Sequence, residues 1–167
     1  MHDLEAHNAV VRFAEKLAIL LGESGMSRMS ARVFAFVLAD DADTYTAKEL
    51  ADGLQVSPAA ISGAVRQLVS AGLMTKGREP GARSDYYRMD DDDVWGTIMA
   101  QRKPFLQRYV DLLTEGAREI GADGAGGRRL RETVEFYRFM DDELAHTLER
   151  WQVRRAAWLE EEARRTD

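Results

Sequence analysis

The amino-acid sequence predicts a mainly α-helical fold with one small β-hairpin, and three observations carry this prediction. Apolar residues recur every three or four positions over most of the 167 residues. Two short helical patterns with capping signals stand close together within 46–70, and a Pro-Gly turn between two strand-like arms follows them. We therefore expect N-terminal helices at 1–39, a small central domain at 40–90 and a C-terminal helical region at 91–167.

Composition excludes several classes of protein. The chain has no cysteine, so disulfides, thiolate metal sites and thiol redox sensing are ruled out. No apolar run reaches the roughly 18 residues of a membrane span, and the N-terminus lacks the features of a secretory signal. We expect a cytoplasmic protein with no membrane partner. Neither an enzyme nor a metal or cofactor site is expected, because no catalytic or ligand spacing involves the three histidines, His2, His7 and His146.

Two helices are predicted before the central domain, at about 4–22 and 27–38, and the Asp-rich segment 40–43 ends the second. The residues expected to be buried in the first helix are Val10, Phe13, Ala14, Leu17, Leu20 and Leu21. Those expected to be buried in the second are Met29, Val33, Phe36 and Val37. Both N-terminal helices therefore present an apolar stripe.

The central pair of helices is marked by its caps. After a short strand expected at 44–45, Thr46 and Glu49 form a capping-box pattern, and this helix should end at 53 or 54. Ser57 then caps a second helix with Pro58 at its first position. Its inner face should carry Ile61, Val65, Leu68 and Val69, and its outer face Ala59, Ser62, Gly63, Arg66 and Gln67. This outer face has small side chains near the start of the helix and a cation one turn later, which suits close approach to a DNA groove.

The segment 74–89 predicts a hairpin centred on Pro80 and Gly81, which would be the wing of a winged helix-turn-helix. Charge is distributed unevenly around it. Within 46–89 six cations stand against four acidic residues, so this segment carries +2, and the total of -6 leaves -8 for the remainder. A basic face on an acidic body is compatible with a DNA-binding protein, although an ordinary acidic protein could show the same local excess by chance.

The C-terminal region should contain two long helices. Asp90 to Asp93 are interpreted as an acidic N-terminal cap rather than a metal site. The following helix should run to about Ile120 with a kink at Pro104, and its stripe is Val94, Ile98, Phe105, Tyr109, Leu112 and Leu113. The Gly-rich segment 121–127 is interpreted as a flexible connection rather than a phosphate cradle.

The last helix is expected at about 128–164, with apolar residues at Leu130, Val134, Tyr137, Leu144, Leu148, Trp151 and Trp158. Such a helix would exceed about 50 Å and needs a partner surface. Pairing of the terminal helices with those of a second copy is the favoured interpretation, because a paired element also suits a palindromic site. The alternative is that the last helix folds back on its own chain.

Segments 22–33, 50–62, 68–73 and 80–88 resemble the MarR superfamily of bacterial winged-helix regulators, and more closely its GbsR-like branch. The resemblance implies a homodimer formed by the N- and C-terminal helices. It also implies that the helix from Pro58 lies in the major groove of double-stranded DNA and that the wing bearing Arg83 reaches the adjacent minor groove.

These observations predict a sequence-specific DNA-binding transcriptional regulator, a ligand-responsive repressor that acts as a homodimer on a palindromic operator. The alternative is a protein-interaction module whose winged helix does not bind DNA. The residues predicted to face the bases are Ser57, Ala59, Ser62, Gly63 and Arg66, and those predicted to hold phosphates or the minor groove are Lys76, Arg78, Arg83 and Arg88.

A small-molecule effector is a further implication of the resemblance, since relatives in the GbsR-like branch respond to choline-type cations. Four side chains are candidates for lining an effector cavity between the winged domain and the dimerising helices: Met26, Met29, Trp95 and Tyr109. Core packing is the competing interpretation, because Met and aromatic residues at helical spacing commonly lie in cores.

Overall fold

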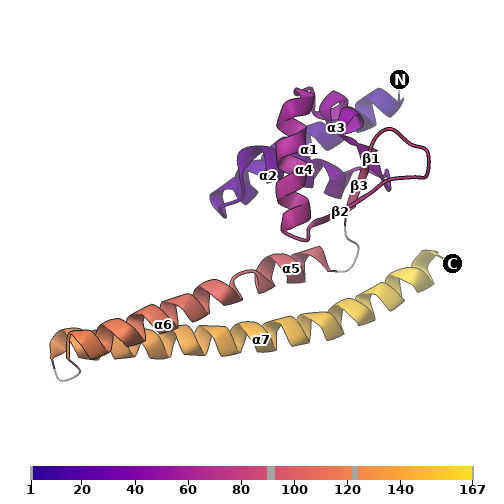
Figure 1. Ribbon diagram of the computed structural model, residues 1–167. Helices are drawn as coiled ribbons and strands as arrows, with labels where there is room; N and C mark the ends of the chain where they lie inside the picture. Colours follow the sequence, from indigo (N-terminus) through magenta and orange to yellow (C-terminus); the bar gives the residue numbers. More distant parts are fainter. Residues whose placement is uncertain (1, 90–92, 122–123, 167) are drawn as a thin grey trace. The chain divides into compact units, whose positions relative to one another are not determined.

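The computed structural model describes residues 2–89, 93–121 and 124–166 (Figure 1). The chain divides into two compact units, 1–94 and 95–167, and each is described by itself. The first unit contains both the expected N-terminal helices and the expected central domain. No helix among the described residues is long and apolar enough to cross a membrane.

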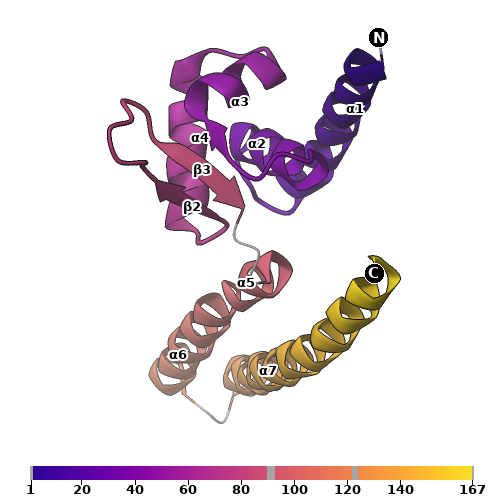
Figure 2. The ribbon, with the colours of Figure 1, turned by 90° about the vertical axis from the view of Figure 1, so that its right-hand side faces the viewer.

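The first unit is built around one central helix and carries a small sheet. Its elements are α1 (His2–Glu23), α2 (Arg28–Ala39), β1 (Tyr45–Thr46), α3 (Ala47–Leu54), α4 (Pro58–Ser70), β2 (Met74–Gly77) and β3 (Tyr86–Met89). Figure 2 shows α2 between α1 and α4, and α2 also contacts α3 and β3. The strands form an antiparallel sheet in the order β1-β3-β2. The predicted mainly α fold with a winged helix-turn-helix is therefore confirmed.

The core of this unit is centred on α2, which is buried on several sides. Phe34 and Val33 of α2 are fully buried. The other large side chains with almost no exposure come from α3, α4 and β2: Leu50, Ile61, Val65, Leu68 and Met74. The inner face predicted for α4 is thus confirmed, except that Val69 is only half-buried.

Both predicted helix caps are present. The Oγ1 of Thr46 accepts a hydrogen bond from the Glu49 amide at 3.2 Å, and the Glu49 carboxylate accepts one from the Thr46 amide at 2.7 Å. These hydrogen bonds from Thr46 lower the pKa of Glu49. At the next helix, Ser57 Oγ accepts from the Ala60 amide at 3.3 Å. The short strand lies one residue later than expected, at Tyr45–Thr46.

Arg32 joins three helices. Its guanidinium pairs with Glu15 of α1, with Nε at 2.6 Å from the carboxylate, and also donates to the Leu54 carbonyl at the end of α3, at 3.3 Å. The Arg32 side chain is 17% exposed, so this ion pair is only partly screened by water. The helix-turn-helix is thereby tied to α1.

The stripe predicted for α1 is partly wrong. Phe13 and Leu20 are 50% and 60% exposed, whereas Ala14, Ala18 and Leu21 are buried. Alanine side chains at the centre of the contact let α1 approach α2 closely, and the larger residues on its flank then remain outside. The length of the helix was predicted well, but the centre of its buried face was not.

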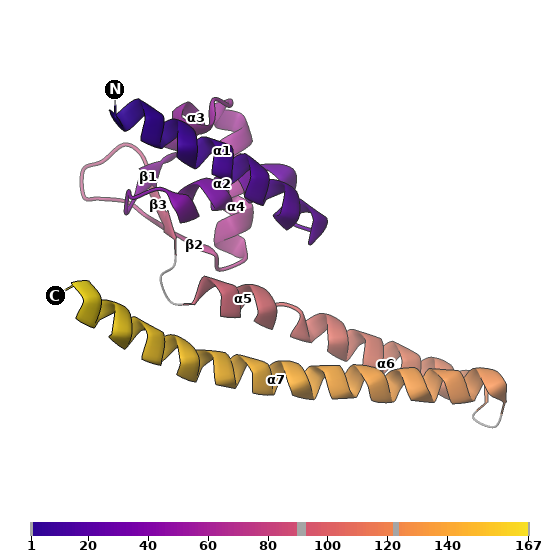
Figure 3. The same cartoon turned by 180° about the vertical axis from the view of Figure 1, so that it is seen from behind.

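The second unit is a long antiparallel helical hairpin. Its elements are α5 (Val94–Ala100), α6 (Lys103–Glu119) and α7 (Ala125–Thr166), although Val94 itself belongs to the first unit. Helices α6 and α7 lie side by side (Figures 1 and 3). The single helix expected with a kink at Pro104 is broken into two. Pro104 lacks an amide hydrogen and its ring would clash with the carbonyl four residues earlier, so a new helix begins beside it.

The connection between α6 and α7 is shorter than predicted, because Gly126 and Gly127 already lie in the first turn of α7. Asp90 to Asp92, interpreted above as part of an acidic cap, lie outside the described residues. Asp93 has a left-handed φ of 75° immediately before α5.

The first half of α7 folds back on its own chain, as the alternative interpretation proposed. Val134 and Leu144 are buried, and Tyr137 stacks on Tyr109 of α6 with ring centroids 4.7 Å apart. The stripe predicted for α6 is displaced: Phe105, Tyr109 and Leu112 are 61%, 49% and 66% exposed. Leu113 of the predicted stripe is half-buried as expected, and the other buried or half-buried apolar residues of α6 are Leu106, Val110 and Ala117. At 42 residues, or about 63 Å, α7 extends well beyond α6.

Candidate nucleic-acid interface

The outer face of α4 has the composition that the sequence predicted. Ala59, Ser62 and Arg66 are exposed and Gly63 is half-exposed, while the opposite side of the helix is buried in the core. The face begins at Ser57, whose hydroxyl oxygen caps the helix and whose hydroxyl proton remains able to donate. Ser62 Oγ donates to the Pro58 carbonyl at 3.0 Å, which leaves its lone pairs as acceptors.

Gly63 has no packing role. A Cβ built on this residue meets no atom within 4 Å, and its φ is not in the left-handed region. A glycine inside a helix costs about 0.8–1.0 kcal/mol relative to alanine. Nothing within the described part of the unit explains that cost, whereas close approach of the α4 backbone to another molecule would.

Arg66 follows Gly63 by three residues, about one helical turn along α4. Its side chain is exposed, and within the described residues it makes no recorded hydrogen bond or ion pair. It borders a shallow hollow whose other lining residues are Gly63, Gln67, Ser70 and Ala71. A guanidinium without an internal partner is available to bind a phosphate or a base edge.

The sequence predicted Gln67 on the outer face of the helix, but its side chain also binds α2. Ser27 Oγ and Ser30 Oγ, at the start of α2, each donate to Gln67 Oε1 at 2.7 Å. Ser30 is also 3.5 Å from the Ala64 carbonyl. This network fixes α4 against α2. No local pattern indicated this network, because Ser27 and Gln67 are 40 positions apart in the chain.

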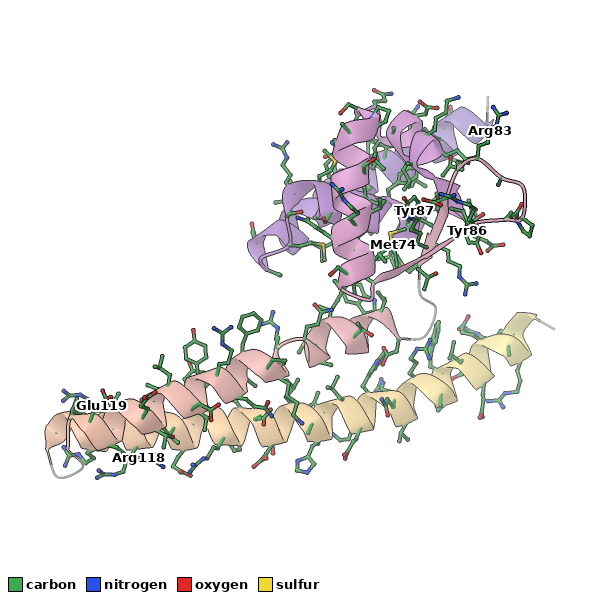
Figure 4. All side chains as sticks on the ribbon, in the orientation of Figure 1. Met74, Arg83, Tyr86, Tyr87, Arg118 and Glu119 are labelled. Atoms are coloured by element: carbon green, nitrogen blue, oxygen red, sulfur yellow. The ribbon has the colours of Figure 1, made fainter. Side chains whose placement is uncertain are left out.

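The register of the hairpin separates the wing cations. Lys76 pairs with Tyr87 across the strands and Thr75 pairs with Arg88, so Lys76 and Arg88 lie on opposite faces. Arg88 Nε donates to Thr75 Oγ1 at 3.1 Å. Arg83 lies on the loop between β2 and β3 (Figure 4) and has no recorded partner among the described residues. The four predicted wing residues therefore do not form one cluster.

Asp85 binds two of the four wing cations. Its carboxylate lies 2.7 Å from Lys76 Nζ and 2.6 Å from Arg78 Nη2. Hydrogen bonds from Lys76 and Arg78 hold the pKa of Asp85 below its usual value, and the same contact raises the pKa of Lys76. Sequence reasoning missed Asp85 as an interface residue, although its place seven residues after Arg78 across a short hairpin was the available signal.

Gly77 of β2 lies against the side chain of Tyr86 in β3. The Tyr86 ring lies directly over it, so that a Cβ on Gly77 would come within 2.3 Å of the ring. We expect Gly77→Ala to displace the Tyr86 ring and to destabilise the hairpin by about 1 kcal/mol or less, because the clash is with the far end of a half-exposed side chain that can move. Amide hydrogen exchange of β2 and β3 would measure the change. Unchanged protection of these strands would contradict the prediction.

Four side chains predicted to line an effector cavity do not belong to one unit. Met26 and Met29 are half-buried in the first unit, whereas Trp95 and Tyr109 are 44% and 49% exposed in the second. Tyr109 stacks on Tyr137 within its own unit. Their role in binding a ligand stays a prediction.

Comparison with known proteins matches two models of one family. A MarR family model matches residues 24–83, and a model for MmpR5-like MarR family transcriptional regulators matches residues 93–154. A curated relative, the HTH-type transcriptional regulator MmpR5 of Mycobacterium tuberculosis (strain ATCC 25618 / H37Rv), is 25% identical over 146 residues. That alignment covers 87% of this chain and 88% of the relative.

Two solved structures share the fold. A crystal structure of a transcriptional regulator has a TM-score of 0.71 at 23% identity, covering 86% of this chain and 98% of the other. TrmBL2, an archaeal chromatin protein described with a novel mode of DNA binding, has a TM-score of 0.54 at 18% identity. The latter match covers 64% of this chain and 40% of the other. At these identities both matches concern the fold alone.

The helix pair α3–α4, the hairpin β2–β3 and the cap at each helix together define a winged helix-turn-helix protein. The two family models and the curated relative show that the chain is similar to MarR family transcriptional regulators over residues 24–83 and 93–154.

Proposed function

We propose that the protein is a ligand-responsive repressor that binds a palindromic operator as a homodimer, with α4 in the major groove and the wing at the neighbouring minor groove. The observation that carries this proposal is the outer face of α4, where a Cβ on Gly63 would meet no atom and Arg66 has no recorded partner among the described residues. Ser57, Ala59, Ser62, Gly63 and Arg66 would face the bases. Lys76, Arg78, Arg83 and Arg88 would contact the backbone or the minor groove.

Binding to DNA would be tested by a gel-shift titration with the duplex upstream of the protein's own gene, repeated across salt concentrations. Affinity should fall steeply with salt, because phosphate contacts release counterions. If no duplex binds even at low salt, the second candidate function remains, namely a winged helix that binds a protein partner. Arg66 and Arg83, which have no recorded partner among the described residues, favour DNA over that candidate.

Gly63→Ala should separate stability from DNA binding. The added methyl has open space in the free protein, so helix propensity should raise the free energy of unfolding by about 0.5–1 kcal/mol. The same methyl would occupy the space between α4 and the groove floor, and DNA affinity should fall. Thermal unfolding and gel-shift titration of the same preparation would measure the two effects.

Gly22→Ala is the matched control for this variant. Gly22 lies in the last turn of α1, and a Cβ there also meets no atom within 4 Å. This control should not lower stability and should leave DNA affinity unchanged. If Gly63→Ala retains full affinity for the operator, the proposed seat of α4 in the groove is wrong.

A homodimer is supported by the apolar side chains left outside both units. Phe105 and Leu112 form an exposed stripe on α6, and Phe13 and Leu20 do so on α1. Large apolar side chains exposed on one face of a helix are typical of a surface that binds a partner. These side chains lie on the N-terminal helix and in the C-terminal helical region, so we propose that a second copy of the chain covers them.

Leu112→Arg should therefore shift the particle from the mass of two chains to the mass of one. Leu112 is 66% exposed, so the substitution leaves the fold of the monomer intact while placing a charge in the proposed interface. Sedimentation velocity would measure the mass, and Gln107→Arg, which adds the same charge at an exposed position on a different face of α6, is the control. A dimer that persists in Leu112→Arg would place the interface elsewhere.

Three finer features belong to this proposal. Membership of the GbsR-like branch rests on the combined resemblance of segments 22–33, 50–62, 68–73 and 80–88. An effector held near Met26, Met29, Trp95 and Tyr109 rests on the same resemblance, and a choline-type cation is the first ligand to test. Action on DNA implies a cytoplasmic location.

A further inference from the structure

The wing contains a carboxylate at the point where DNA contact would require positive charge. Asp85 is bound by Lys76 at 2.7 Å and by Arg78 at 2.6 Å, and Arg78 Nε gives a second contact at 2.7 Å. We call this cluster of Asp85, Lys76 and Arg78 the wing clasp. It joins one end of β2 to the residue that precedes β3.

We propose that Asp85 takes the place of a DNA phosphate in the free protein, so that a phosphate must displace it before Lys76 and Arg78 contribute to binding. Asp85 would thus lower the affinity of the wing for DNA backbone and weaken its dependence on salt. This inference rests on the proposed function of the protein as a DNA-binding regulator.

Exposure makes such an exchange feasible. The side chains of Lys76 and Arg78 are 49% and 60% exposed, whereas that of Asp85 is 20% exposed. The two cations are therefore more accessible to solvent than the carboxylate between them. An incoming phosphate can approach them while the hairpin keeps its register. Guanidinium groups bind carboxylate and phosphate with the same forked geometry, so one oxyanion can replace the other.

The exchange also has an electrostatic cost. Asp85 offsets one of the two clasp cations, and after displacement it remains beside the bound phosphate as a like charge. Binding of Lys76 and Arg78 then releases fewer counterions from the DNA than two free cations would, because part of their charge is already neutralised by Asp85. Arg83, which lies outside the clasp and has no recorded partner among the described residues, carries no such cost.

Asp85→Asn is the first test, with a duplex of unrelated sequence and a salt series. The variant should bind this duplex more tightly than the wild type at low salt. The slope of log affinity against log salt should become steeper by about 1–2, since each additional phosphate contact contributes about 0.9. Thermal unfolding would verify that the hairpin remains folded.

Glu79→Gln is the matched control, because it removes one negative charge from the same hairpin. Glu79 is exposed and makes no recorded ion pair within the described residues. Its effect on the slope should be smaller than that of Asp85→Asn. Equal effects of the two variants would mean that Asp85 acts only through net charge, and this result would overturn the inference.

Arg78→Gln in both backgrounds gives a second, independent test. If the wing clasp restrains Arg78, its loss should weaken binding only slightly in the wild type and by several-fold more in Asp85→Asn. Equal losses in the two backgrounds, or weaker binding by Asp85→Asn itself, would overturn the inference. Absence of binding by the wild type at low salt would instead overturn the proposed function, and the inference with it.

Discussion

Phe34→Ala is expected to lower the free energy of unfolding of the first unit by about 3–5 kcal/mol. Phe34 is fully buried on α2, the helix that contacts α1, α3 and α4. The substitution removes a large buried side chain from the core and leaves a cavity that the packed helices fill only in part. Since domains of this size have a total stability of about 5–15 kcal/mol, the variant should be partly unfolded near physiological temperature.

Urea unfolding followed by circular dichroism would measure this loss, and amide exchange in α2 and α4 would assign it to the first unit. Phe139→Ala is the matched control, because Phe139 is 58% exposed on α7 and its removal should cost about 0.5 kcal/mol or less. A loss below about 1 kcal/mol for Phe34→Ala would show that α2 is not the centre of the core.

The helix-turn-helix could be predicted in detail because its signals are local. Thr46 and Glu49 are three residues apart, and Ser57 stands next to Pro58, so each cap is decided within a single turn of chain. The outer face of α4 followed from helical periodicity alone, since its inner positions were uniformly apolar. Gly63 and Arg66 were accordingly found on the face where they were expected.

What the sequence did not reveal depends on contacts between distant residues. Phe13 was expected in the core because it is apolar and suitably spaced, but the small residues beside it decided which face of α1 packs. Ser27 binds Gln67 across 40 positions, and Asp85 meets Lys76 only after the hairpin has its register. Periodicity identifies the candidates for such contacts and does not choose among them.

The break at Pro104 lies between these two cases. The residue was recognised as a disturbance, but whether a proline bends a helix or ends it depends on what the two flanking segments pack against. Here α6 begins beside Pro104 and packs along α7, while α5 is a separate short helix. The packing of α6 against α7 also explains the exposed stripe of Phe105 and Leu112, because α7 covers only one side of α6.

Arg66→Ala is expected to weaken operator binding by about 1–3 kcal/mol, or roughly 5- to 150-fold, if the guanidinium binds a guanine through two hydrogen bonds. The residue lies on the exposed face of α4 beside Gly63, which has no side chain to hold the backbone away from the groove. Within the described residues no carboxylate competes for Arg66, in contrast to Lys76 and Arg78. The stability of the free protein should therefore change little.

Two comparisons decide what Arg66 contacts. Arg66→Lys should recover little of the lost affinity if the contact is a forked one, because an ammonium group cannot reproduce the planar geometry of guanidinium. Arg12→Ala, which removes an exposed cation from α1, should leave operator affinity almost unchanged. Titration against operators with single base changes should show that Arg66→Ala loses discrimination at one position in each half-site. An equal loss on every duplex would instead assign Arg66 to a phosphate, because backbone contacts do not depend on the base sequence.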